Sequence, residues 1–124
     1  MKLTKRELLL ALALGLTFAA IFFQYRLLKL RLAFAEEQIA IFFESRSSAL
    51  KAADTTQAVS FLEYASEYYP SGTKQSPGSR LDRIVETVRS NCVQDIITDL
   101  KRRTGKDLGS APTNWYKEFP PARP

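Results

Sequence analysis

The sequence predicts an all-α protein, in which an N-terminal transmembrane helix continues into a stalk helix. A small helical hairpin with a short C-terminal helix follows. Two observations predict this class. The first is an uncharged, strongly apolar run over residues 8–25. The second is the spacing of apolar residues in the rest of the chain, which follows the period of an α-helix in each segment between loops.

The apolar run is long enough to cross a lipid bilayer. At about 1.5 Å per residue its eighteen residues would span roughly 27 Å as a helix, close to the ~30 Å hydrocarbon core. Basic residues flank it on both sides: Lys2, Lys5 and Arg6 before it, and Arg26, Lys29 and Arg31 after it. Their side chains suit anionic lipid headgroups, so residues 1–25 are predicted to be a membrane anchor whose partner is membrane lipid.

A cleaved secretory signal is the alternative to an anchor, since signals also combine a basic start with an apolar core. Cleavage needs small residues shortly after that core. Ala33 and Ala35 have the required spacing but lie ten residues or more beyond Phe23, after three basic residues. The sequence therefore favours an uncleaved anchor. A secreted, soluble helical binding domain stays open as the second interpretation.

The orientation of the anchor follows from its short N-terminal tail. The α-amine and three basic side chains precede the run, and three basic side chains follow it, so the positive-inside rule is nearly balanced. Because so short a tail is more simply left in the cytoplasm, the C-terminal domain is predicted to lie on the non-cytoplasmic side.

Three small residues recur every four positions within the run: Ala11, Gly15 and Ala19. They share one face of a helix, and small residues at this spacing let two membrane helices approach closely. This predicts self-association into a homo-oligomer, although alanine and glycine are also common in apolar helices without any such role.

Residues 26–53 contain no Pro or Gly and are predicted to form a stalk or juxtamembrane helix. Its expected apolar side consists of Ile39, Phe42, Phe43, Leu50 and Ala53. A small helical domain over residues 54–119 and a disordered, proline-rich tail over residues 120–124 complete the predicted organisation.

The small domain shows helix start and stop signals. Asp54 and Gln57 have the form of a capping box before a second helix, which Pro70 is expected to end. Residues 70–78 are a polar loop, and Ser79 is expected to cap a third helix with Asp82 stabilising its N-terminal dipole. That helix should end at Gly105, with Lys101, Arg102 and Arg103 complementing its C-terminal dipole.

The predicted core combines the apolar stripes of these helices. Ser110 and Pro112 indicate the cap and first turn of a short last helix, which places Trp115 and Phe119 on one face. The expected core residues are Phe61, Leu62, Ala65, Ile84, Val88, Ile96, Ile97, Leu100 and Trp115.

Composition excludes several function classes. The chain has no histidine and a single cysteine, Cys92, which removes histidine-based hydrolytic triads, HExxH metalloprotease chemistry and cysteine zinc sites. The net charge of +5 is too small and too dispersed to predict nucleic-acid binding. Asp95 and Asp99 lie one turn apart and could share a metal, but such pairs are more often a solvated face.

No catalytic residues and no cofactor are therefore predicted. The interpretation that remains is a single-pass, membrane-anchored helical interaction or scaffold module, bound to a protein partner that the sequence does not identify.

One segment resembles a known pattern. The run TGKDLG at 104–109, followed by Trp115, is similar to the closing segment of some bacterial HEAT-like helical proteins. Together with LEY, YYPSGTKQ, the GS-LDRIVE pattern and II-x-x-L, it resembles small bacterial single-pass membrane proteins with the same order of motifs over about residues 55–119. The resemblance implies helix packing at the C-terminus and no particular reaction, ligand or cofactor.

Overall fold

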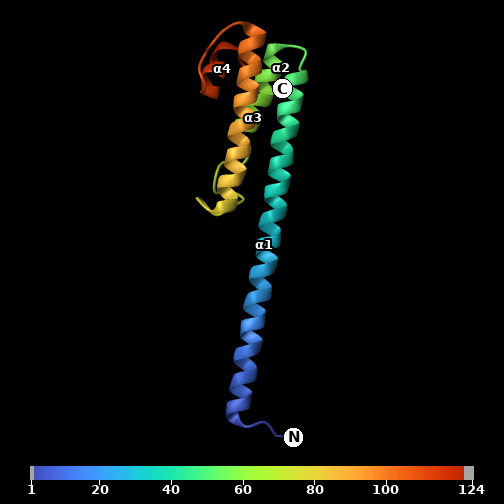
Figure 1. Ribbon diagram of the computed structural model, residues 1–124, viewed down its shortest axis with the longest axis vertical. Coiled ribbons are helices and arrows are strands. Elements are labelled where there is room, and N and C mark those ends of the chain that lie inside the picture. Colours follow the sequence, from blue (N-terminus) through green and yellow to red (C-terminus); the bar gives the residue numbers. More distant parts are fainter. Residues whose placement is uncertain (1, 122–124) are drawn as a thin grey trace. The chain divides into compact units, whose positions relative to one another are not determined.

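The computed structural model describes residues 2–121, and within them it contains four helices and no strand, so the predicted all-α class is confirmed (Figure 1). Residues 122–124 of the predicted tail lie outside the described residues. The helices are α1 (Lys5–Lys51), α2 (Thr55–Glu67), α3 (Arg80–Thr104) and α4 (Pro112–Glu118).

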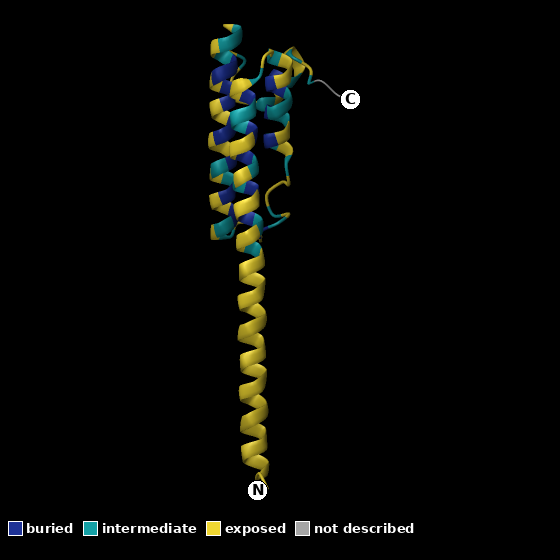
Figure 2. Cartoon of the chain, turned by 90° about the vertical axis from the view of Figure 1, so that its right-hand side faces the viewer, coloured by how far each residue is buried: buried dark blue, intermediate teal, exposed yellow. Residues whose placement is uncertain are grey.

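The chain divides into two compact units, and the boundary falls within α1. Unit 1 is Met1–Ala33 and unit 2 is Phe34–Pro124. The segment assigned to a stalk from the sequence thus contributes residues from Phe34 onward to unit 2. The side chains before Phe34 are almost all exposed, whereas each helix of unit 2 has buried positions (Figure 2).

The start of α1 is fixed by a capping box that the sequence analysis missed. The Thr4 amide donates to Glu7 Oε2 at 2.8 Å, and the Glu7 amide donates to Thr4 Oγ1 at 3.3 Å. This reciprocal pair satisfies two backbone N–H groups that a helix start leaves without partners. The T-x-x-E spacing that signals it is visible in the sequence.

Unit 2 has two adjoining apolar clusters built around α3. The larger one joins α2, α3 and α4 with the end of α1, and it includes Leu62, Ile96, Leu100 and the fully buried Trp115. The smaller one joins α1 to the first half of α3 through Ala35, Phe42, Val85 and Cys92. Residues 34–51 of α1 are therefore part of the core of this unit.

The predicted apolar side of residues 26–53 is largely wrong. Phe42 is buried as expected, but Phe43 is 55% exposed and Leu50 also faces solvent. The buried stripe of α1 consists mostly of small or polar residues: Ala35, Gln38, Phe42, Ser45 and Ala49. Short side chains at successive turns suit close helix packing, and a hydrophobicity pattern gives them little weight.

The stripe on α3 is mostly confirmed, with one clear error. Ile96, Ile97 and Leu100 are buried as predicted, whereas Ile84 is 46% exposed. The next residue, Val85, occupies the core position, because one step along a helix turns a side chain by about 100°. Val88 and Phe61 are only half-buried.

Most helix ends match their sequence signals. Asp54 Oδ1 accepts from the Gln57 amide at 2.7 Å, Ser79 caps α3, and Gly105 takes a left-handed conformation with φ +70°. The prediction for α4 was wrong in detail, because its N-cap is Ala111 and not Ser110. Pro112 at the first position supplies the fixed φ that starts this helix.

Candidate functional site

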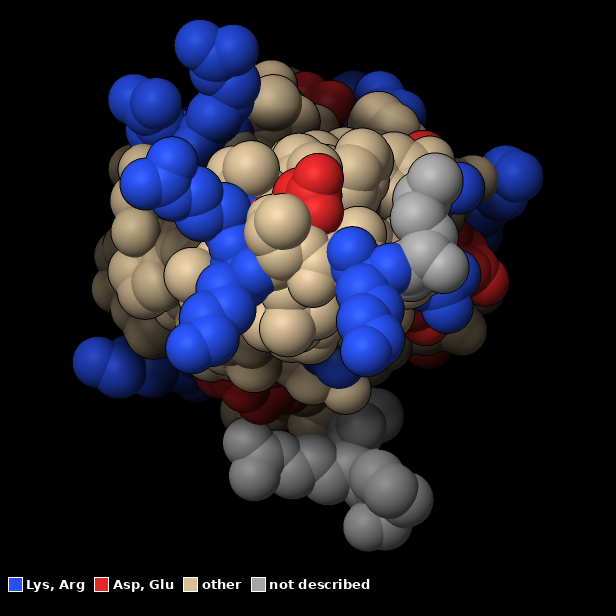
Figure 3. Space-filling view, turned by 90° about the horizontal axis from the view of Figure 1, so that it is seen from below, with Lys and Arg blue, Asp and Glu red and all other residues tan. Residues whose placement is uncertain are grey.

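The first functional element is the exposed apolar surface of α1. This helix contains an 18-residue window that is long and apolar enough to cross a membrane, and none of that window is buried within the protein. It is the only such helix among the described residues. Seen from below, Lys and Arg side chains border a surface of uncharged residues (Figure 3).

The polar groups within this window are satisfied internally where they could be costly in lipid. The Thr17 hydroxyl donates to the Ala13 carbonyl at 2.8 Å, one turn earlier. A hydroxyl bonded in this way needs no water, which suits a helix surrounded by hydrocarbon.

The small residues Ala11, Gly15 and Ala19 all lie in α1 and are exposed. A Cβ built on Gly15 would meet no atom within 4 Å. A larger side chain at this position therefore clashes with nothing in its surroundings, and any effect of such a substitution would arise from contacts outside this chain.

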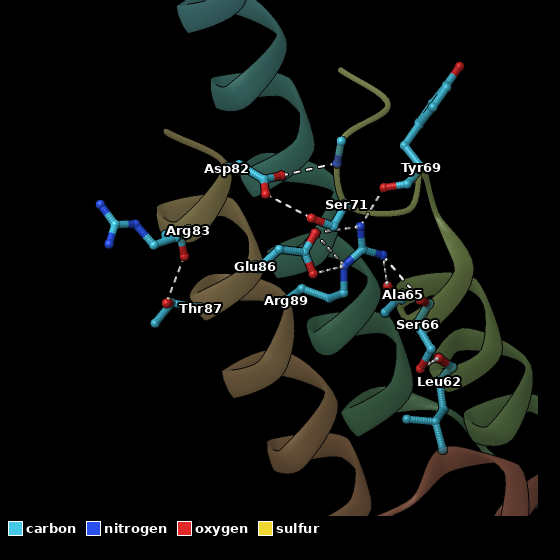
Figure 4. A network of polar contacts seen from close by, with 11 residues as sticks. Leu62, Ala65, Ser66, Tyr69, Ser71, Asp82, Arg83, Glu86, Thr87 and Arg89 are labelled. Carbon is cyan, nitrogen blue, oxygen red and sulfur yellow. Dashed lines mark hydrogen bonds and ion pairs between the residues drawn. The ribbon is translucent and has the colours of Figure 1, made fainter. Parts of the chain in front are cut away.

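The second element is a buried arginine at the junction of α2 and α3 (Figure 4). Arg89 donates from Nη1 to the carbonyls of Ala65 and Ser66 at 3.0 and 3.2 Å, and from Nη2 to that of Tyr69 at 2.6 Å. Its Nε is 3.1 Å from Glu86 Oε2. Arg89 thus satisfies carbonyls that the end of α2 leaves without helical partners.

The residue after this helix end is strained. Tyr69 has φ +41°, a left-handed conformation that residues with a Cβ rarely adopt. Its carbonyl is held by Arg89, and Lys74 Nζ lies 4.4 Å from the centre of its ring. These contacts hold a turn that the local sequence would not adopt alone.

Asp82 orders the loop that precedes α3. Its carboxylate accepts from the Ser71 hydroxyl at 2.7 Å and from the amides of Gly72 and Gly78 at 3.2 and 3.1 Å (Figure 4). The Ser71 hydrogen bond is the largest influence lowering the pKa of Asp82, and burial opposes it. The sequence analysis gave Asp82 only a helix-dipole role, so its function in holding the loop is an addition.

A second arginine closes α1 in the same way as Arg89 closes α2. Arg103 donates from Nη1 to the Ala52 carbonyl at 2.5 Å and from Nη2 to the Ala49 carbonyl at 3.3 Å. Asp99 Oδ2 lies 3.2 Å from its Nη2. Arg103 was predicted to complement the dipole of its own helix, and its main role is instead to cap α1.

The acidic side chains of α3 are engaged in structural contacts. Asp95 pairs with Arg46 at 2.7 Å, Asp99 pairs with Arg102 at 2.5 Å, and Glu86 pairs with Arg89. Among residues 2–121 no cluster of three or more His, Cys, Asp or Glu side chains is placed to hold a metal ion. The Asp95–Asp99 pair is thus divided between two arginines.

The single thiol is also structural. Cys92 is buried between α1 and α3, and this burial raises the pKa of its thiol. A protonated, buried thiol is a poor nucleophile.

The TGKDLG segment holds α4 against α2. Asp107 Oδ1 accepts from the Gly109 amide at 3.0 Å, and Trp115 Nε1 donates to the Gly109 carbonyl at 3.1 Å. Asn114 Nδ2 donates to the Leu108 carbonyl at 3.0 Å, and Lys101 pairs with Asp107 at 3.2 Å. Each of these contacts is internal, which matches the packing role that the resemblance implies.

One surface hollow of about 360 Å³ lies between α1 and α2. Ile41, Phe61 and Tyr64 form its apolar part, and Glu44 is its one charged lining residue. Its size is within the range of ligand and peptide sites, but it lacks the convergent polar groups that would orient a small molecule.

Comparison of the chain with protein-family models, with curated proteins and with solved structures finds no significant match.

Proposed function

We propose that the protein is a single-pass, membrane-anchored interaction or scaffold module, in which α1 holds the helical unit 2 at the membrane. The observation that carries this proposal is the 18-residue apolar window of α1, none of which is buried by the protein itself. So large an apolar surface is strongly unfavourable in water, and lipid is the solvent that suits it.

The same proposal favours an anchor over a cleaved signal. Cleavage after Ala35 would remove two residues from unit 2, and Ala35 itself belongs to the cluster around Phe42. The site would also have to unfold, because Ala35 lies within α1 and peptidases act on extended chains. The secreted binding domain remains the alternative function, and the two differ in the N-terminus of the mature protein.

Interaction, rather than catalysis, fits the side chains of unit 2. The buried polar groups Asp82, Arg89 and Asp99 all hold helix ends or the loop. The sequence has no histidine, and we propose neither a reaction nor a cofactor. The partner of unit 2 is a protein, and the C-terminal side of the anchor lies outside the cytoplasm.

Carbonate extraction tests the anchor directly. Washing membranes at alkaline pH should leave the full-length protein in the pellet, because an integral helix is not released by loss of ionic contacts. Release into the supernatant would refute the anchor, and mass spectrometry of the mature N-terminus would then identify any cleavage. Protease treatment of intact cells and of inverted membranes reports the side on which unit 2 lies.

Self-association through Ala11, Gly15 and Ala19 is the finer part of the proposal. Gly15→Leu should lower energy transfer between labelled copies in vesicles, since the added side chain keeps the helices apart. Because Gly15 has open space around it, the substitution should not disturb its own chain. Leu14→Ala is the matched control, and equal signals for the two variants would remove the small-residue stripe from the proposal.

A further inference from the structure

We propose that the exposed start of α3 docks on the surface of the same membrane that holds α1, through contacts with anionic lipid headgroups. The docking surface is the arginine patch, which consists of Arg80, Arg83, Ile84, Thr87 and Val88 around a hollow of about 290 Å³. This inference rests on the membrane anchor of the proposed function and assigns a second membrane contact to unit 2.

The charges of the arginine patch have no protein partner. Within the described part of unit 2, Arg46, Arg89, Arg102 and Arg103 each pair with a carboxylate. Arg80 and Arg83 are exposed, and neither guanidinium has an ion pair among the described residues. Two unpaired arginines one turn apart present a surface that suits phosphate groups.

The patch also has an apolar component. Ile84, which the sequence analysis assigned to the core, is 46% exposed between these arginines, next to the half-buried Val88. Arginine beside an exposed aliphatic residue is typical of surfaces that lie at the boundary between headgroups and acyl chains. A purely aqueous role would leave the exposure of Ile84 without a function.

The patch lies at the end of unit 2 where the chain enters. Lys74 Nζ is 4.6 Å from the ring centre of Phe34, the first residue of that unit. Asp82 bonds to Ser71 and Gly78 and thereby holds the same loop on the first turn of α3. Figure 1 shows the start of α3 and α4 at opposite ends of unit 2.

The tether keeps this end near the bilayer. Nine positions separate Tyr25, the last residue of the apolar run, from Phe34. Even a fully extended segment of that length reaches only about 32 Å, and a helical one about 14 Å. The local concentration of headgroups at the patch is therefore high, and weak contacts are enough to populate a docked state.

The acidic side chains near this end define how strong the docking can be. Asp82 and Glu86 are engaged by the loop and by Arg89, but Glu36 and Glu37 are exposed on α1. Each basic residue at an anionic surface strengthens binding by about fivefold, so Arg80 and Arg83 together contribute roughly 25-fold. Glu36 and Glu37 act in the opposite direction, which provides a test of sign.

The experiment uses the full chain in nanodiscs of phosphatidylcholine, alone or mixed with phosphatidylglycerol. A fluorophore is attached at Thr73→Cys, in the loop beside the patch, or at Thr113→Cys in α4, each in a Cys92→Ala background. Quenching by acrylamide, a neutral water-soluble reagent, measures access. We expect the anionic lipid to reduce quenching at least twofold at position 73 and to leave position 113 unchanged.

Charge variants decide whether the patch is responsible. Arg80→Gln with Arg83→Gln should restore quenching at position 73, and Glu36→Gln with Glu37→Gln should reduce it further. The matched control, Arg102→Gln with Lys117→Gln, removes the same charge from side chains exposed elsewhere on unit 2 and should change nothing. Raising the salt concentration should mimic the first variant, since it screens contacts between exposed charges.

The results separate the docking from the anchor. If carbonate releases the full-length protein, the anchor and the docking both fail. If the protein stays in the membrane but quenching at position 73 is the same in both lipids, or is unaffected by the two arginine substitutions, the docking alone is overturned.

Discussion

The two parts of α1 obey opposite rules. In unit 1 the helix is apolar on all sides, and its candidate span is wholly exposed. In unit 2 the same helix buries a stripe in which Ala35, Ser45 and Ala49 are small, while the larger Phe43 faces solvent. The comparison teaches that the hydrophobicity of a segment identifies its solvent, whereas burial within the fold depends on which side chains let two helices approach.

The comparison is broken most directly at Phe42, the one large residue in the buried stripe of α1. Phe42→Ala should destabilise unit 2 by about 3–5 kcal/mol, because it leaves a cavity against α3 and removes the ring that contacts Tyr68 and Arg89. Urea unfolding of the full chain in mild detergent, followed by the fluorescence of the buried Trp115, measures this change.

Its neighbour Phe43 is the matched control. Phe43→Ala removes the same atoms from an exposed position and should cost less than about 1 kcal/mol. Similar unfolding midpoints for the two variants would mean that the segment from Phe34 to Lys51 does not pack in the core.

A smaller effect is expected at the end of α2. Arg89→Met keeps the length of the side chain but leaves the carbonyls of Ala65, Ser66 and Tyr69 without their donor. The expected cost is about 2–3 kcal/mol, since unpaired buried acceptors are expensive. Hydrogen exchange should also become faster in the last turn of α2. Unchanged exchange there would show that the cap is not needed.

The pH dependence of stability tests the loop. Asp82 has a folded-state pKa below its ordinary value of 3.8, so it stabilises the fold fully above that pH. This contribution is lost as the pH falls through the lower, folded pKa. Asp82→Asn should therefore weaken the acid-induced loss of stability in unfolding experiments between neutral and acidic pH. A parallel pH profile for the variant would contradict this role.

The smallest effect is expected at Arg102, whose side chain is 76% exposed beside its pair Asp99. Arg102→Ala should cost at most about 1 kcal/mol, as is usual for exposed ion pairs. Arg103→Ala, one position further, removes the cap of α1 and should cost clearly more in the same unfolding experiment. Equal costs would remove the distinction between these two arginines.

The sequence predicted the features that depend on local chemistry. The all-α class, the caps at Asp54 and Ser79, and the left-handed Gly105 follow from short-range patterns, and the structure confirms them. Ile84 was misplaced because Val85 beside it satisfies the same apolar spacing, and only the direction of α1 chooses between them.

Long-range polar contacts lay outside what the sequence could predict. Arg89 and Arg103 looked like ordinary surface residues of a charged helix, and their carbonyl partners lie between 20 and 54 positions away. The exposed surface of α1 was predicted in outline from its apolar run, since membrane spans depend on composition alone. The arginine patch became visible only when the pairing of every other described arginine in unit 2 was known.

The two capping arginines also bear on how the protein is made. Both belong to α3, yet they complete α2 and α1, which leave the ribosome earlier. During synthesis the ends of α1 and α2 therefore stay open until residue 103 emerges, and unit 2 can close only after the apolar window has been available to the insertion machinery for about seventy residues. This order of events separates insertion from folding in time, so that the anchor enters the bilayer before a finished domain has formed behind it.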